Sequence, residues 1–276
     1  MRVVIFLFLS MFLSFSYGKP VVYTTVKPIA DIISQITGEK VYYIIPPNTS
    51  PHTYEIKFSS LKGVYDADLF VYIGSGEPPI EGLLQSIPEE KRIKLLDLKE
   101  LNVIEDEDHH HKHPAIWLNP DNAVVIAKYI TKKLEQIDPE NKENYEKRFK
   151  KFVEKITELK NYGLKKIGSL KNKKFISYHY AWPYFTQAFG LEYVGVVEMG
   201  HGREPTPKHL INLINTIKKY KIKSIFASKQ FYNRKYISLI KNNTNVNVVF
   251  LDPFGIDKGY LDMMKFNIDR VYEGLH

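Results

Sequence analysis

Residues 139–166 read PENKENYEKRFKKFVEKITELKNYGLKK, and this stretch decides the fold. Apolar residues recur in it at three- and four-residue spacing, at Tyr145, Phe149, Phe152, Ile156 and Leu159. This spacing matches the period of an α-helix, so the segment predicts one long amphipathic helix with a charged outer face. At 1.5 Å per residue the helix runs for about 40 Å, the length of a domain. We therefore predict a rigid spine at 138–170 that links two lobes.

Short β-rich apolar segments alternate with helical patterns on both sides of this spine. Before it, we predict strands near 20–26, 40–45, 69–74 and 92–97, and helices at 27–37, 57–66, 78–87 and from Pro120, capped by Asn119. After it, we predict strands near 174–178, 193–198, 223–228 and 247–251, and helices at 181–189, 207–219, 233–242 and 259–274. Such alternation is typical of α/β proteins with parallel sheets. The predicted fold is α/β: two lobes, at 19–137 and 171–276, each a mainly parallel sheet flanked by helices, bridged by one long rigid helix.

The first eighteen residues, MRVVIFLFLSMFLSFSYG, predict a secretory signal peptide at 1–18. Arg2 gives this segment its positive charge, an apolar stretch follows, and the small residues Ser16 and Gly18 come last. The segment is shorter than a membrane span needs, and an uncleaved anchor is the alternative. The chain contains no cysteine, so we expect neither disulfides nor a lipid-bearing cysteine. These features predict a freely soluble periplasmic monomer whose mature chain does not insert into a membrane.

The composition is that of a globular protein, with 44% hydrophobic and 25% charged residues in a chain of 276. The net charge is +8, but the lysines are spread over many segments and mixed with glutamate. No zinc-finger, helix-turn-helix or RNA-binding signature accompanies them, so nucleic acid is not an expected partner.

Residues 105–119, EDEDHHHKHPAIWLN, contain four histidines directly after four acidic residues: His109, His110, His111 and His113. Imidazole and carboxylate are the side chains that hold borderline transition metals. A polar surface loop that happens to be rich in histidine is the alternative. The run therefore raises the question of whether the rest of the chain contains a metal site.

Ligands of parallel α/β sheets bind beyond the carboxyl ends of the strands, so we searched there for metal-binding side chains. His52 follows the strand at 40–45, in a loop that prolines stiffen, and a surface histidine is the alternative. His179 follows the strand at 174–178 among aromatic residues, and a hydrogen-bonded core histidine is the alternative. Asp252 follows the strand at 247–251, where it could instead cap the next turn.

Three further residues have side chains that can bind a metal but occupy less clear positions. Glu55 lies three residues after His52 and could support the site or cap a helix. His201, between two glycines in a strand-end loop, is a candidate for the mouth of a cleft. His209 falls inside a predicted helix, and we interpret it as structural.

The mature chain resembles the zinc/manganese solute-binding proteins of ABC importers over nearly its full length. The resemblance rests on the order of five motifs: SPHTYE (50–55), IWLNP (116–120), YHYAWPYF (178–185), EPTPKHL (204–210) and LDP (251–253). It implies two α/β lobes bridged by a rigid helix, with the metal in the cleft between them. The ligands it implies are His52 from the first lobe and His179 and Asp252 from the second. Manganese-type members carry glutamate where this chain has His179, and the softer imidazole favours zinc.

One position departs from the family pattern. The family typically has a histidine two residues before the tryptophan of IWLNP, where this chain has Ala115. His113 lies two residues earlier, roughly 6.6 Å away along an extended chain, so it can substitute only if the loop is re-routed. We expect His113 or a neighbouring histidine of 109–111 to complete the site. Otherwise three protein ligands remain, with water or Glu55 as the fourth.

The predicted function is transport. The protein is expected to capture Zn²⁺, with Mn²⁺ less favoured, and to pass it to a membrane permease driven by an ATPase, without catalysing a reaction itself. The acidic His-rich run would then collect metal weakly beside the cleft. The alternative is a secreted zinc-dependent hydrolase with a three-ligand open site, although its usual HExxH motif is missing.

Overall fold

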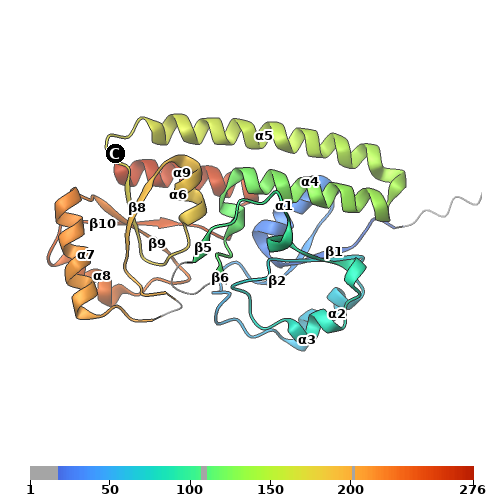
Figure 1. Ribbon diagram of the computed structural model, residues 1–276, viewed down its shortest axis with the longest axis horizontal. Coiled ribbons are helices and arrows are strands. Elements are labelled where there is room, and N and C mark those ends of the chain that lie inside the picture. Colours follow the sequence, from blue (N-terminus) through green and yellow to red (C-terminus); the bar gives the residue numbers. More distant parts are fainter. Residues whose placement is uncertain (1–17, 107–110, 201–202) are drawn as a thin grey trace, which may run out of the picture.

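The computed structural model describes residues 18–106, 111–200 and 203–276 (Figure 1). Almost all of the predicted signal peptide, together with His109, His110 and His201, lies outside the described residues. In the described part of the chain, none of the helices combines the length and apolarity that crossing a bilayer demands.

The first lobe is built on a four-stranded parallel sheet in the order β2-β1-β3-β4. Its strands are β1 (Val22–Val26), β2 (Tyr42–Ile45), β3 (Leu69–Tyr72) and β4 (Arg92–Lys94). Its helices are α1 (Lys27–Thr37), α2 (Phe58–Tyr65) and α3 (Glu81–Gln85), with short 3₁₀ turns η1 (Glu89–Lys91) and η2 (Leu95–Asp97). The predicted strand at 92–97 is therefore half strand and half 3₁₀ turn.

The second lobe repeats this plan with the strand order β10-β9-β7-β8, again parallel throughout. Its strands are β7 (Lys174–Ser177), β8 (Glu192–Val196), β9 (Ser224–Ser228) and β10 (Asn247–Leu251). Its helices are α6 (Pro183–Phe189), α7 (Pro207–Tyr220), α8 (Arg234–Lys241) and α9 (Tyr260–Leu275). All five residues of β9 are buried, as expected for a central strand covered by helices on both faces.

The spine consists of a 3₁₀ turn η4 (Pro139–Asn141) and the long helix α5 (Lys142–Gly168), and the helix α4 (Pro120–Ile137) precedes it. Asn119 caps α4 as predicted, because its side chain accepts a hydrogen bond from the Asp121 N–H. The periodic apolar residues of α5 that lie buried include Tyr145, Phe152 and Ile156. In Figure 1, α5 spans the top of the molecule above both lobes. The predicted α/β fold with a bridging helix is confirmed, while the boundaries at 137 and 171 stay predictions.

The C-terminal helix α9 also connects the two lobes. It lies beneath α5, begins near the middle of the molecule and ends on the side of the second lobe (Figure 1), and it packs against α5, β10 and α1. The Tyr260 hydroxyl, at the start of α9, donates a hydrogen bond of 2.8 Å to the Trp117 carbonyl. The Trp117 indole in turn donates one of 2.7 Å to the Pro253 carbonyl. One buried cluster runs through both lobes, so the cleft has a rigid base.

The His-rich segment contains structure that the sequence did not predict. Strands β5 (Glu105–Asp106) and β6 (His111–Lys112) pair in antiparallel register, so the segment is a hairpin. The chain then passes through a 3₁₀ turn, η3 (Ile116–Leu118), into α4. After the hairpin, His113 and Ala115 are buried, and His113 contacts Tyr180 and Tyr184 of the second lobe.

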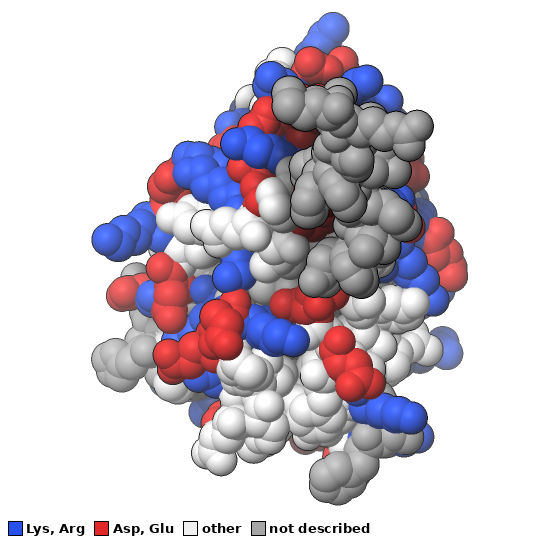
Figure 2. All heavy atoms as spheres, turned by 90° about the vertical axis from the view of Figure 1, so that its right-hand side faces the viewer, with Lys and Arg blue, Asp and Glu red and all other residues white. Residues whose placement is uncertain are grey.

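Charged side chains of both signs are mixed on the face that Figure 2 shows, which is the right-hand end of Figure 1. Lysine and arginine side chains lie beside aspartate and glutamate side chains there, with uncharged areas between them. On this face the excess positive charge of the chain is therefore not gathered into a single patch.

Candidate metal centre

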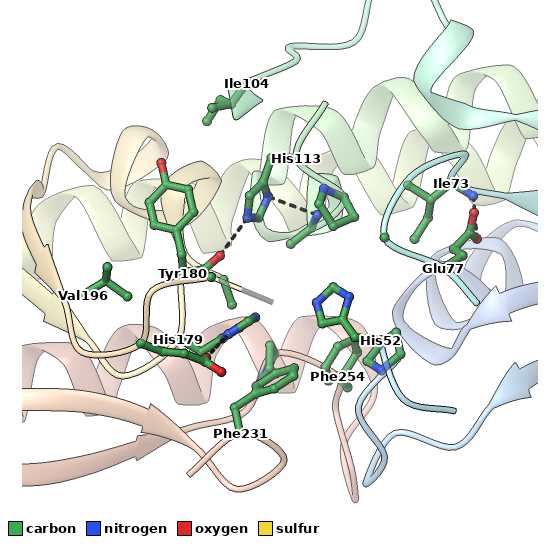
Figure 3. A pocket seen from close by; sticks show the side chains of 18 of the residues that line it. His52, Ile73, Glu77, Ile104, His113, His179, Tyr180, Val196, Phe231 and Phe254 are labelled. Carbon is green, nitrogen blue, oxygen red and sulfur yellow. Dashed lines mark hydrogen bonds and ion pairs between the residues drawn. The ribbon is translucent and has the colours of Figure 1, made fainter. Parts of the chain in front are cut away.

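A cavity of about 600 Å³ lies between the two lobes, where loops following strands of both sheets converge. The first lobe contributes Pro51 and His52, and the second contributes His179, Glu198 and Phe231. The His-rich hairpin supplies Glu105, His113 and Ala115 to the same wall. Figure 3 shows the rings of His52, His113 and His179 around this cavity.

His52 lies on the first lobe, in the loop that follows β2. Turn hydrogen bonds from Thr49 N–H to Pro46 O (3.0 Å) and from Thr53 N–H to Ser50 O (3.2 Å) shape this loop. The ring centroid of His52 is 5.7 Å from that of His179, across the cleft. The structure thus brings together the two histidines predicted from opposite lobes. Glu55 does not line the cavity.

His179 follows β7 and is held by its neighbours on two sides. Its ring stacks on Phe231, with centroids 4.0 Å apart and an interplanar angle of 17°. Its Nδ1 atom lies 2.5 Å from Oε2 of Glu198. An ionised carboxylate can only accept, so Nδ1 carries the proton and Nε2 keeps a lone pair that can bind a metal.

Glu198 is the site residue that sequence reasoning missed. It was predicted as the last residue of a strand at 193–198, whereas β8 ends at Val196 and Glu198 lies just beyond it. The rule that selected the other candidates, a polar side chain after a parallel strand, finds Glu198 only when the strand ends at Val196.

His113 lines the cavity, but both of its ring nitrogens are hydrogen-bonded to the backbone. Nε2 lies 2.9 Å from the Tyr180 carbonyl oxygen, and Nδ1 accepts a bond of 3.3 Å from the Ala115 N–H. Its ring packs edge-on against Tyr180 and Tyr184. To bind a metal, His113 would have to exchange one of these bonds.

Asp252 follows β10 as predicted, but it does not line the cavity. Its carboxylate accepts backbone hydrogen bonds from Phe254 (3.1 Å), Gly255 (2.8 Å) and Ile256 (2.9 Å). Gly255 has φ of +66°, a conformation that glycine adopts without strain, and this lets the turn close around the carboxylate. In this arrangement Asp252 caps the turn, and Pro253 and Phe254 face the cavity instead.

Arg203 and two other polar residues, His209 and Glu77, also line the cavity. His209 lies near the start of α7, and its Nε2 donates a hydrogen bond of 2.8 Å to the Val196 carbonyl. The Glu77 carboxylate accepts from the N–H groups of Ile73 (2.9 Å) and Gly74 (2.7 Å). Burial raises the pKa of Glu77 in spite of these bonds.

The site is only partly assembled. Among the described residues, no group of three or more His, Cys, Asp or Glu side chains stands close enough together to hold a metal ion. His52 and His179 are candidate donors from opposite lobes, with ring centroids 5.7 Å apart. His113 and Asp252 are each engaged with the backbone instead.

Comparison with known proteins places this chain in a family. Residues 22–274 match the family model described as ZnuA, zinc-uptake complex component A, periplasmic. The chain belongs to this ZnuA family. The manganese ABC transporter substrate-binding lipoprotein ScaA of Streptococcus gordonii is 30% identical over 281 residues, which cover 94% of this chain and 90% of that protein. The metal ABC transporter substrate-binding lipoprotein SsaB of Streptococcus sanguinis is 29% identical over 268 residues, which cover 90% and 86%.

Solved structures of the ZnuA family have the same architecture. A crystal structure of ZnuA superposes with a TM-score of 0.85 at 26% identity, covering 94% of this chain and all of that one. The laminin-binding protein Lmb of Streptococcus agalactiae, described as an adhesin with metal-transporting activity, gives 0.81 at 25% identity and covers 94% and 100%. This chain is therefore a substrate-binding protein of the metal ABC transporter type, a class whose partners are a metal ion, a permease and an ATPase. Family members are solute-binding proteins, not enzymes.

The predicted localisation needs correction. The streptococcal relatives are named lipoproteins, which contradicts a freely soluble periplasmic protein without a lipid anchor. That prediction rested on the lack of cysteine, which removes one attachment chemistry and says nothing about other means of holding a protein at a membrane. A position facing the outside of the cell fits these relatives.

Proposed function

We propose that this protein captures a divalent transition-metal ion in the interlobe cavity, Zn²⁺ in preference to Mn²⁺, and delivers it to the permease of an ABC importer. The observation that carries the proposal is the approach of His52 and His179 from opposite lobes, with ring centroids 5.7 Å apart. A metal bound between them would hold the lobes together, as a captured substrate does in a two-lobed binding protein.

The preference for zinc rests on the donor atoms. Imidazole nitrogens suit zinc, whereas manganese prefers carboxylate and water oxygens. The names of relatives point both ways: ScaA is described as a manganese protein, and an AdcAII variant of Streptococcus pneumoniae, 27% identical, is described as Zn(II)-bound. We therefore base the proposed preference for zinc over manganese on the nitrogen donors in this cavity.

His52 and His179 are proposed as the first two ligands, and His113 and Asp252 as candidates for the others. Zinc in proteins typically takes four ligands. His113 would have to release its bond to Ala115 or Tyr180, and Asp252 its turn N–H groups. Each such exchange costs on the order of 1 kcal/mol, far less than a metal–ligand bond contributes.

The acidic His-rich segment at 105–113 is proposed as a weak collector that raises the local metal concentration beside the cavity. Its described hairpin places Glu105 and His113 on the cavity wall. The hydrolase alternative is not retained, because the relatives are binding components of transporters. We propose that the protein catalyses no reaction.

The test is metal analysis and titration of the purified protein. Protein prepared without chelator should carry zinc, and the metal-free protein should bind Zn²⁺ more tightly than Mn²⁺ in a calorimetric titration. His179→Ala should lower the zinc affinity by orders of magnitude. His276→Ala, at the exposed chain end and away from the cavity, is the matched control and should bind like the wild type. Equal zinc affinity in all three proteins would refute the proposed site.

A further inference from the structure

Glu198 is placed by the backbone and buried beside His179. Its N–H donates a hydrogen bond of 2.9 Å to the Tyr178 carbonyl, and the N–H of Val197 donates one of 2.9 Å to the Ser177 carbonyl. These bonds extend the pairing of β7 and β8 beyond the strands. The Glu198 side chain is 12% exposed and lines the cavity. Its position is therefore fixed independently of any metal.

Two contacts define the orientation of the His179 ring. Stacking on Phe231 sets the plane of the ring, and the bond from Nδ1 to Glu198 sets its rotation within that plane. The same bond fixes the tautomer, because a carboxylate accepts the Nδ1 proton and leaves Nε2 unprotonated. A metal ligand that is held in this way needs no reorganisation when the ion arrives.

Glu105 also lines the cavity, and two further carboxylates near it, those of Glu77 and Asp252, are bonded to backbone N–H groups. The Glu77 carboxylate is bonded to backbone N–H groups of the first lobe, and that of Asp252 is bonded within its own turn outside the cavity. The net charge of the chain is +8, so a dication entering the cleft benefits from a local negative charge. The Glu198 carboxylate lies at the cavity and is hydrogen-bonded to the imidazole of His179, so it can supply this negative charge beside the proposed ligand.

We infer that Glu198 is a positioning residue for metal capture: it holds His179 in the Nδ1–H tautomer, aims Nε2 into the cavity and strengthens that nitrogen as a donor. The inference rests on the proposed function, since it assigns a role at the same site. A bonded carboxylate of this kind typically changes metal affinity by about 10- to 100-fold when it is removed.

The experiment compares Glu198→Leu and Glu198→Gln with the wild type, using Glu192→Gln as the control. Glu192 is the first residue of β8, the strand that precedes Glu198, and it pairs with Lys174 at the surface. Two quantities are measured: the tautomer of His179 in the metal-free protein, from its imidazole ¹⁵N shifts, and the Zn²⁺ affinity, by competition with a chromogenic chelator. A merely structural residue would leave the tautomer unchanged.

We expect Glu198→Leu to lose the Nδ1–H preference and about 10- to 100-fold in zinc affinity. Glu198→Gln can still accept from Nδ1 through its amide oxygen, so it should keep the tautomer and lose less affinity. Glu192→Gln should match the wild type in both. If Glu198→Leu does not fold, an intermediate affinity with a retained tautomer in Glu198→Gln still supports the inference.

Two results would overturn it. Wild-type tautomer and affinity in Glu198→Leu would show that Phe231 alone orients the ring. A loss in Glu198→Gln as large as that in His179→Ala would make Glu198 a direct ligand. Failure of the proposed function is distinct, because the wild-type protein itself would then bind no zinc, while the tautomer in metal-free protein would still report on Glu198.

Discussion

The side-chain amide of Gln230 donates a hydrogen bond of 2.7 Å to the carbonyl oxygen of Pro47, and so joins the two lobes beside the cavity. Pro47 belongs to the loop that carries His52. Gln230 directly precedes Phe231, on which the ring of His179 stacks. The bond therefore links the supports of the two histidines that face each other across the cleft.

Removing this link should weaken metal retention. Gln230→Ala loses one neutral hydrogen bond, worth about 1 kcal/mol, so we expect the Zn²⁺ affinity to fall about fivefold. The loss should come mainly from faster release, measured by stopped-flow transfer of zinc to a chelator, because the lobes part more easily.

Gln187→Ala is the matched control for this prediction. Gln187 accepts a hydrogen bond of 2.8 Å from the Asn102 side chain, also between the lobes, but neither residue lines the cavity. Zinc release from this variant should match the wild type. Equal acceleration in both variants would show that general loosening of the lobes, and not the support of His52, controls release.

Restoring the family histidine should tighten binding. Ala115 lines the cavity and is buried, and the cavity of about 600 Å³ has room for a larger side chain. We expect Ala115→His to raise the Zn²⁺ affinity, since it adds an imidazole without requiring His113 to give up its bonds to Tyr180 and Ala115. Calorimetry of the variant decides, and an unchanged or lower affinity would mean that the position is not an empty ligand slot.

The fold could be predicted because its signals are local and periodic. The apolar spacing in 139–166 specifies α5, and the alternating strands and helices specify the two parallel sheets. The hairpin of β5 and β6 escaped prediction because each strand is two residues long and polar, which leaves no hydrophobic period to detect.

The site was harder to predict because a candidate side chain can either face the cavity or form hydrogen bonds with the backbone. The sequence placed His52 and His179 correctly at strand ends, and the structure brings them together. Whether Asp252 faces the cavity or caps its turn depends on the path of residues 253–256, which includes a glycine with positive φ. The bond between His179 and Glu198 joins residues 19 positions apart, so no local sequence pattern predicts it.

The contact between α5 and α9 should make the stability of the fold depend on pH. Asp269 is bonded to Lys166 (2.5 Å) and Lys265 (2.7 Å) and to the Tyr162 hydroxyl. Partial burial raises the pKa of Asp269, but these hydrogen bonds outweigh burial and lower the pKa to about 2. In the unfolded chain the pKa of an aspartate is about 4. The lowered pKa in the fold therefore gives its full stabilisation above about pH 4, and this stabilisation is lost as the pH falls toward 2.

We therefore expect Asp269→Asn to lower the free energy of unfolding at pH 7 by about 1 kcal/mol, after allowance for solvent screening. The difference from the wild type should shrink between pH 4 and pH 2, as measured by urea denaturation. Glu273→Gln, which breaks the exposed pair with Arg270, is the control and should change stability by less than about 0.5 kcal/mol. A gap that stays constant with pH would mean that Asp269 is not the titrating group.

Metal selectivity should follow the residue at position 179. His179→Glu replaces a nitrogen donor by oxygen, which favours manganese over zinc. The new carboxylate would face that of Glu198, however, and two carboxylates this close repel each other when both are ionised. The single substitution should therefore weaken binding of both ions, while His179→Glu combined with Glu198→Gln should recover Mn²⁺ binding and not Zn²⁺ binding. Competitive titration of the two ions measures the ratio of affinities, and a ratio unchanged from the wild type in the double variant would show that selectivity is set elsewhere in the cleft.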